Sequence, residues 1–193
     1  TGIELYTSTI NPNRGAWLEY ETDINDIFYV RIDKNRKIYI TAFIRALGLS
    51  SNDDIRRFFG DDAKLEATME KDETRNTEEA LMEVFKKLRH GEPVTLESAQ
   101  QHIDNLFFDP HRYDISRVGR YKYNRKLSML NRLPGCTVAQ PVIAEYTGEL
   151  LAEPCEILTK QKALEIEQAG VMKVVVACED GSELFVISNG MTD

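Results

Sequence analysis

The sequence predicts an α+β fold: an antiparallel β-meander packed with a helical cluster, followed by a small α+β C-terminal module. Between residues 4 and 40, apolar and polar residues alternate as they do in strands with one solvated face. From Ile40 the apolar spacing changes to three and four residues, which is typical of amphipathic helices. Beyond residue 134, short β-rich segments surround a single helical pattern.

Three strands are expected in the meander. Residues 5–10 are rich in β-forming side chains and end at the turn cluster of residues 11–15. A second strand begins at Trp17, and the third covers residues 27–32, where every other residue is apolar. The polar residues 33–37 then predict a turn.

Helical spacing recurs between residues 40 and 107. A first helix is expected from Ile40 to the C-capping Gly48, and a second is expected after Ser51 or Asn52 as the N-cap. Residues 64–75 predict either a short helix or a mobile connection. Two further helices are expected to begin at Thr77, read as an N-cap, and at Thr95, and the short turn of residues 90–93 predicts that they form an antiparallel pair.

The C-terminal segment predicts two hairpins and one helix. Residues 138–144 and 149–152 form the first expected hairpin, and residues 158–168 the helix. The second hairpin joins residues 173–177 to 183–187 through the Asp-Gly turn of residues 179–182. We place a boundary near Pro134-Gly135, which gives domains 1–133 and 134–193.

Composition excludes several classes of protein. The chain has 193 residues, of which 42% are hydrophobic, so it can bury a core, and it contains no apolar run long enough to cross a membrane. Its net charge of −8 argues against a free-standing DNA-binding protein. Cys136, Cys155 and Cys178 suggest neither a disulfide framework nor a zinc site, and they fit a reducing cytosol. Because it opens on Thr1 rather than Met, we expect a segment of a longer protein.

The charge of residues 107–127 is opposite to that of the rest of the chain. Six cations stand there against Asp109 and Asp114, and three tyrosines are interleaved with them. The cations are Arg112, Arg117, Arg120, Lys122, Arg125 and Lys126. Phosphate backbones and exposed bases select this composition. An exposed amphipathic helix with a solvated basic face, entered through Asp109-Pro110, is the alternative interpretation.

The sequence predicts no catalytic residue and no metal site. It has no Gly-rich phosphate loop, no nucleophile elbow, no His-Glu-x-x-His helix and no Asp-x-Asp cluster, and its three histidines are scattered. A second candidate binding feature is the turn that holds Arg14 and Trp17, the only tryptophan. Trp17 is either a core or edge-packing residue or a platform that stacks on an unpaired base, with Arg14 on a neighbouring phosphate.

Ordered motifs in the first 127 residues resemble the beta subunit of bacterial DNA-directed RNA polymerase. These motifs occupy residues 11–21, 29–33, 44–48, 88–93 and 107–124. The resemblance implies the lobe of that subunit, a non-catalytic part of a nucleotidyltransferase that lines the DNA cleft and contacts downstream duplex and the non-template strand. It also implies a cytoplasmic, nucleoid-associated assembly with the beta-prime and alpha subunits and sigma factor, and no membrane.

The resemblance also assigns site residues. Trp17 is expected to stack on a non-template base and Arg14 to hold the adjacent backbone. With the basic stretch, the expected DNA-binding residues are Arg14, Trp17, Arg117, Arg120, Lys122 and Arg125. The metal-binding aspartates and catalytic lysines of the family lie elsewhere, so we expect no cofactor in this segment, and the catalytic Mg²⁺ is bound in other parts of the polymerase.

Three parts of the chain depart from the family pattern. Asn13 replaces a tyrosine, the entry at residues 37–41 differs, and residues 134–193 resemble a truncated, lineage-variable insertion. A protein-interaction module that binds transcription factors without DNA contact is the alternative function, favoured by the acidic balance and by the C-terminal segment.

Overall fold

The structure is a computed structural model, and it describes residues 2, 4–179 and 181–189. The chain forms two compact units, residues 1–116 and residues 117–193. Each unit has a hydrophobic core of its own. The α+β class is confirmed, because both units combine helices with antiparallel strands.

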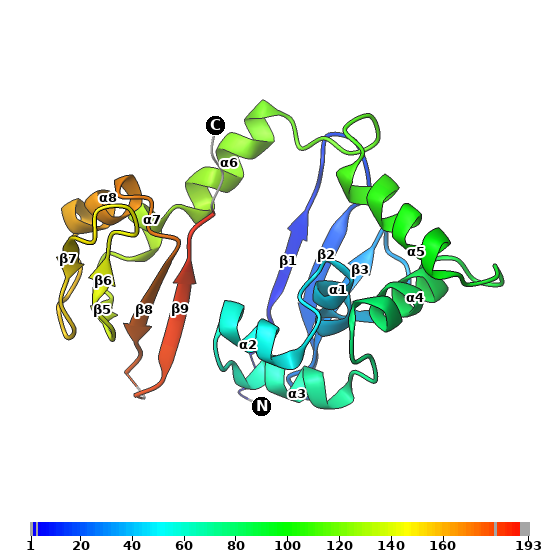
Figure 1. The fold of residues 1–193 in the computed structure, drawn as a ribbon, viewed down its shortest axis with the longest axis horizontal. Coiled ribbons are helices and arrows are strands. Elements are labelled where there is room, and N and C mark those ends of the chain that lie inside the picture. The colour runs from blue at the N-terminus through cyan, green and yellow to red at the C-terminus, as the bar shows by residue number, and fades with distance from the viewer. Residues whose placement is uncertain (1, 3, 180, 190–193) are drawn as a thin grey trace. The chain divides into compact units, whose positions relative to one another are not determined.

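The first unit is built on the predicted meander, whose strands lie in the order β1-β2-β3-β4, each antiparallel to its neighbour (Figure 1). The strands are β1 (Thr7–Ile10), β2 (Leu18–Thr22), β3 (Phe28–Ile32) and β4 (Ile38–Tyr39). The register places Leu18 between Ile10 and Ile32. This apolar row faces the core, as the alternation of the sequence predicts.

The first unit also contains several helices. They are α1 (Ile40–Ala46), α2 (Asn52–Phe59), α3 (Ala63–Lys71), α4 (Thr77–Leu88), α5 (Leu96–Ile103) and a π-helical turn, η1 (Asp104–Phe108). Buried side chains of α1, α4 and α5 pack on the sheet to form the core of this unit. Residues 63–71 are therefore helical, which decides between the two expectations for that stretch.

The N-cap of α4 differs from the prediction. Asn76, not Thr77, caps the helix, because its side chain accepts a hydrogen bond from the Glu79 amide at 2.9 Å. The asparagine is extended (φ −148°) and is among the side chains that best satisfy the first free amides of a helix. Ser51 caps α2 in a reciprocal capping box with Asp54.

The second unit combines short helices with two small sheets. Its elements are α6 (Arg117–Leu127), α7 (Met129–Arg132), β5 (Thr137–Val138), β6 (Val142–Ile143), β7 (Leu150–Ala152), α8 (Lys160–Gln168), β8 (Lys173–Ala177) and β9 (Glu183–Ile187). One sheet has the order β5-β8-β9, and the other pairs β6 with β7. The predicted β8–β9 hairpin is confirmed, although Asp180 of its turn lies outside the described residues.

The expected strand of residues 138–144 is divided. Its first part, β5, pairs with β8, and only β6 pairs with β7. The intervening Pro141 has no amide hydrogen to give to a strand ladder, which accounts for the break.

The two units divide earlier than the boundary that we place near Pro134-Gly135. Met129 and Leu133 precede that point, yet they are buried in the core of the second unit with α8 and the β5-β8-β9 sheet. The compact units therefore part between Ser116 and Arg117.

A candidate nucleic-acid interface

Trp17 lies in the connection from β1 to β2, and its side chain is 43% exposed. Its backbone is held firmly, because the Trp17 amide donates to Asp33 Oδ1 at 2.8 Å and its carbonyl accepts from the Asp33 amide at 2.9 Å. The neighbouring Ala16 and Leu18 are buried. The indole is thus an exposed aromatic surface on a fixed piece of backbone.

A cation lies beside that indole. Asp33 and Lys34 both have positive φ, 50° and 59°, and the Asn35 amide donates to the Ile32 carbonyl at 3.0 Å, which defines a type I′ turn. The turn places Lys34 Nζ 5.9 Å from the centroid of the Trp17 ring, within cation–π range. Trp17, Asp33 and Lys34 together line a shallow depression of the surface.

Arg14 is held by its backbone and leaves its side chain exposed. Its amide donates to the Asp114 carbonyl at 3.0 Å, and the Asp114 amide donates back to the Arg14 carbonyl at 2.9 Å. The guanidinium lies in solvent, three residues before the exposed indole. Arg14 and Trp17 therefore belong to one short turn of the first unit.

The basic stretch is only partly helical. Residues 117–127 form the exposed helix α6, but residues 109–116 are not helical, so the expectation that the helix is entered through Asp109-Pro110 is wrong. Asp109 Oδ1 accepts from the His111 amide at 2.8 Å and the Asp109 carbonyl accepts from the Tyr113 amide at 2.9 Å, which makes this segment a turn. The bridge between Asp114 and Arg14 then fixes the turn to the first unit.

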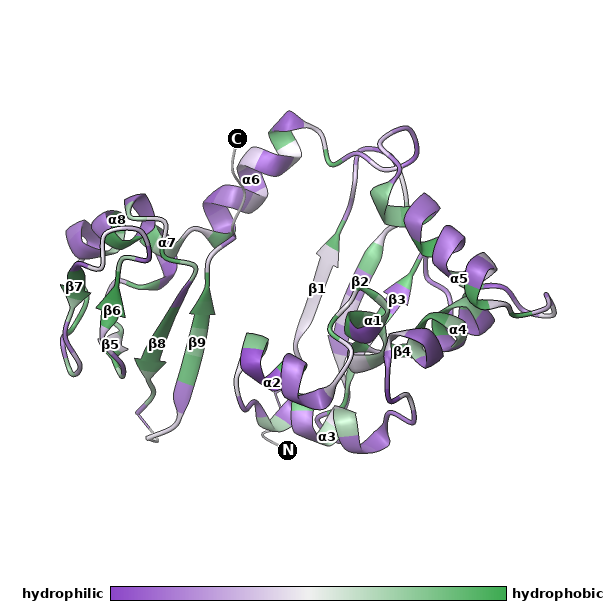
Figure 2. Ribbon diagram, viewed as in Figure 1, coloured by the Kyte–Doolittle hydropathy of each residue, from purple (hydrophilic) through white to green (hydrophobic). Residues whose placement is uncertain are grey.

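Helix α6 contains no buried residue and is strongly hydrophilic (Figure 2). The four predicted DNA-binding cations of this helix, Arg117, Arg120, Lys122 and Arg125, are all exposed. Among the described residues, none of the ion pairs involves any of these four. Their guanidinium and ammonium groups are available to an anionic partner.

The cations of α6 do not share one face. At 3.6 residues per turn, Arg117, Lys122 and Arg125 fall within an arc of about 140°. Arg120 lies about 60° from Arg117, beyond the end of this arc and between the half-buried Tyr123 and Asn124. The four predicted cations of α6 thus belong to the second unit, whereas Arg14 and Trp17 belong to the first.

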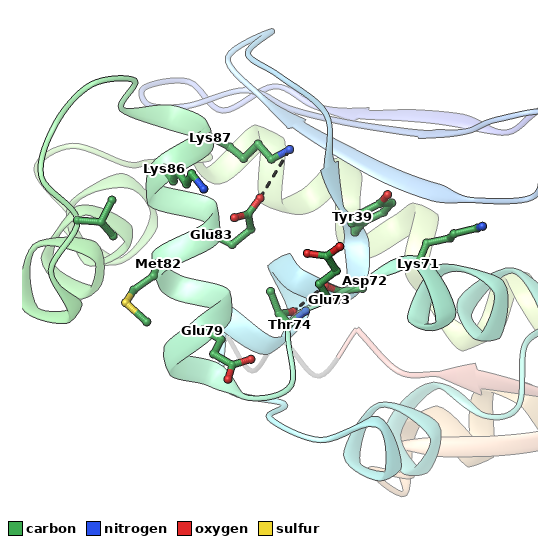
Figure 3. Close-up of a pocket in the computed structure, with 11 residues that line it drawn as sticks. Tyr39, Lys71, Asp72, Glu73, Thr74, Glu79, Met82, Glu83, Lys86 and Lys87 are labelled. Carbon is green, nitrogen blue, oxygen red and sulfur yellow. Dashed lines mark hydrogen bonds and ion pairs between the residues drawn. The ribbon is translucent and has the colours of Figure 1, made fainter.

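The first unit also has a depression of about 660 Å³ between α4 and the segment that follows α3 (Figure 3). Its walls carry both signs of charge, including Glu79, Glu83, Lys86 and Lys87, and Glu83 pairs with Lys87 at 3.6 Å. Within the described residues, no group of three or more His, Cys, Asp or Glu side chains is placed to hold a metal ion. No helix of the described chain is long and apolar enough to cross a membrane.

The sequence does not predict that Asp33 and Lys34 lie beside Trp17. Asp33 and Lys34 belong to the predicted polar turn, but a type I′ conformation at Asp-Lys has no glycine or asparagine to announce it. Their proximity to Trp17 follows from the β2–β3 register, which pairs Leu18 with Ile32. Knowledge of the β2–β3 register would therefore be needed to predict this contact.

The first unit is thus an α+β scaffold that presents an exposed indole with the Lys34 ammonium group beside it. By comparison with known proteins, the chain belongs to the family described as RNA polymerase Rpb2, domain 2, whose model matches residues 1–140. Across all 193 residues it is 50% identical to a protein of Clostridium kluyveri and 51% identical to one of Clostridium novyi, both named DNA-directed RNA polymerase subunit beta. A Clostridium botulinum protein of the same name is 50% identical.

The comparisons confirm the resemblance to the beta subunit. They cover 100% of this chain, including the C-terminal segment, but the chain spans only 16% of the length of each of these relatives.

Proposed function

We propose that this chain is a non-catalytic lobe segment of a DNA-directed RNA polymerase beta subunit, which lines the DNA cleft and contacts downstream duplex and the non-template strand. The observation that carries the proposal is the exposed, backbone-anchored Trp17 beside Lys34 in a chain of this family. An aromatic ring stacks on any base, since every base has a π-face. This surface suits the unpaired strand of a transcription bubble.

The turn that holds Trp17 supplies the contacts such a strand needs. A base stacked on the Trp17 ring would bring its flanking phosphates toward the exposed Arg14 and toward Lys34. In this proposal Arg117, Lys122 and Arg125 of α6 contact phosphates without reading sequence.

Catalysis belongs to other parts of the polymerase in this proposal. The segment holds no catalytic Mg²⁺ and no catalytic residue, and it works in assembly with the beta-prime and alpha subunits and sigma factor in the nucleoid. The chain's net charge of −8 gives it no general attraction to DNA, so the positive field must come mainly from those partners.

Exposed apolar residues on the second unit favour a second candidate function for that unit, the binding of a transcription factor. Ile143 and Leu150 are opposite one another in the β6–β7 pair and are 49% and 50% exposed, and Tyr146 in the connecting turn is 90% exposed. Tyrosine is enriched at protein interfaces, and exposed apolar side chains that lie together are typical of protein-binding surfaces. In that case unit two would bind protein and leave DNA to the first unit.

The test of the proposal is Trp17→Ala in reconstituted polymerase. Loss of one stacked base, worth about 1–3 kcal/mol, should shorten the lifetime of the open complex by about 5- to 150-fold. Phe58→Ala is the matched control, because Phe58 is a similarly exposed aromatic residue (49%) on α2. An open-complex lifetime that equals that of the wild type would reject the stacking role of Trp17.

A further inference from the structure

The turn of residues 109–114, which we name the clasp, packs directly on the turn that carries Trp17. Two backbone hydrogen bonds of 3.0 and 2.9 Å join Arg14 to Asp114. The two segments are far apart in sequence and lie in the same compact unit. The clasp therefore holds in place the backbone that immediately precedes Trp17.

Gly15 makes this contact possible. Its φ is +115°, and a Cβ at this position would lie 2.7 Å from Tyr113 Cδ2 and 2.9 Å from the Arg112 carbonyl oxygen. Both distances are well below van der Waals contact. Because the carbonyl oxygen belongs to the backbone, a change of rotamer cannot relieve that clash. Any side chain at position 15 would push the clasp away from the Trp17 turn.

The clasp is anchored in the hydrophobic core. The Tyr113 ring packs edge-to-face on Phe107, with centroids 5.8 Å apart, and Phe107 packs in the same way on Phe43 at 5.7 Å. Phe43 is only 4% exposed. These three packed rings therefore link the hydrophobic core of the first unit to the part of the clasp that lies against Gly15.

The other end of the Trp17 turn is held by Asp33, whose carboxylate and amide both bond to the Trp17 backbone. We propose that Gly15 and Tyr113 are positioning residues that fix the Trp17 indole in an exposed orientation before any base arrives. This inference rests on the proposed function, since an immobile platform matters only if Trp17 binds a ligand. Such preorganisation removes the entropy cost of ordering the platform on binding.

Trp17 is the only tryptophan of the chain, so its fluorescence reports on this turn directly. In the 193-residue chain, Gly15→Ala should lower the anisotropy of Trp17 emission and increase its quenching by acrylamide. Gly48→Ala is the matched control, because Gly48 has a similar φ of +123° but nothing within 4 Å of its Cβ position. If Gly15→Ala and Gly48→Ala both give the same anisotropy and quenching as wild type, the proposal that the clasp positions Trp17 is rejected.

Tyr113 variants separate positioning from general folding. Tyr113→Phe keeps the ring that contacts Phe107 and should keep the wild-type anisotropy, whereas Tyr113→Ala should lower it. Circular dichroism spectra that match wild type would show that the variants are folded. A Tyr113→Ala chain that is folded and retains the wild-type anisotropy would remove Tyr113 from the proposal.

The open-complex lifetime of reconstituted polymerase then tests whether positioning of Trp17 by the clasp matters for function. Gly15→Ala should shorten the open-complex lifetime toward that of Trp17→Ala, and it should have no further effect when Trp17 is already alanine. If Gly15→Ala loosens Trp17 and Trp17→Ala shortens the lifetime while Gly15→Ala does not, positioning is rejected. If Gly15→Ala loosens Trp17 but Trp17→Ala leaves the lifetime unchanged, the proposed function fails and the clasp still stands.

Discussion

Arg45 Nε lies 3.6 Å from Asp72 Oδ2, and the two side chains are only 2% and 1% exposed. Thr41 Oγ1 and Thr74 Oγ1 donate to the Asp72 carboxylate at 2.6 and 2.7 Å. The Arg45 guanidinium donates to the Ser50 carbonyl at 3.4 Å and to the Asn52 side chain. Burial lowers the pKa of Arg45 from its ordinary value, and the nearby Asp72 carboxylate opposes this shift. The pair joins α1 to the start of α2 and to the segment after α3.

We predict that Arg45→Ala destabilises the first unit severely, by about 3–5 kcal/mol, because it leaves the Asp72 carboxylate buried without its cation. Urea unfolding followed by Trp17 emission measures this loss in the unit that contains both residues. Arg36→Ala removes an exposed arginine of the same unit and should cost less than about 0.5 kcal/mol. Equal unfolding midpoints for the two variants would contradict a structural role for the pair.

Thr68 of α3 ties that helix to the sheet. Its Oγ1 accepts from the Phe28 amide at 2.9 Å and donates to the Lys64 carbonyl at 2.6 Å, and the residue is fully buried. Thr68→Val preserves shape but leaves the Phe28 amide without a partner, which should cost about 1–3 kcal/mol. Thr68→Ser keeps the hydroxyl and should lose less. The comparison uses the same urea assay, and a Thr68→Val chain as stable as the Thr68→Ser chain would refute the bond's contribution.

The imidazole of His102 predicts a dependence of stability on pH. Burial, with the Arg89 guanidinium nearby, lowers its pKa from the ordinary value of 6.5, and Glu92 opposes the shift. The unfolded chain therefore binds a proton at this site more readily than the folded chain does. Protonation of His102 therefore costs the folded state no stability above pH 6.5, and the free energy of unfolding declines as the pH falls below that value.

His102→Phe tests this dependence, because phenylalanine preserves an aromatic ring against Phe85, whose centroid lies 5.5 Å from that of His102. The variant should lose less stability than wild type between pH 7 and pH 5 in urea unfolding. Parallel pH profiles for the two chains would show that His102 contributes nothing to the acid sensitivity.

Local patterns predicted the elements whose stabilising contacts are close in sequence. The alternation in residues 27–32 and the Asp-Gly pair in the sequence between the last two strands are local signals, so β3, β8 and β9 are predicted nearly to the residue. The Ser51 cap of α2 was predicted for the same reason.

Contacts between distant segments were not predictable from these patterns. The Arg45–Asp72 pair, the Phe28–Thr68 bond and the Arg14–Asp114 bridge each join positions that only the folded chain brings together. The same limit applies to the candidate site. Arg14 and Trp17 belong to one short turn that is visible in the sequence, but the contact of Lys34 with Trp17 depends on strand register and a turn of unusual composition.

The arrangement of cations on α6 makes a sharper prediction than their number. Arg120 and Lys122 lie about 160° apart around the helix, so a duplex that docks on the side of Lys122 leaves Arg120 the farthest of the four cations from its phosphates. Because Lys122 lies only about 60° from Arg125 around the helix, the two can face one duplex. Lys122→Ala in reconstituted polymerase should therefore reduce the salt dependence of DNA binding by about 0.9 in the slope of log K against log salt concentration. Arg120→Ala should leave the slope unchanged, and so should Lys160→Ala, which removes an exposed cation from α8. A slope that changes with Arg120 and not with Lys122 would place DNA on the other side of α6, and a slope that changes with neither would assign the basic stretch a structural role.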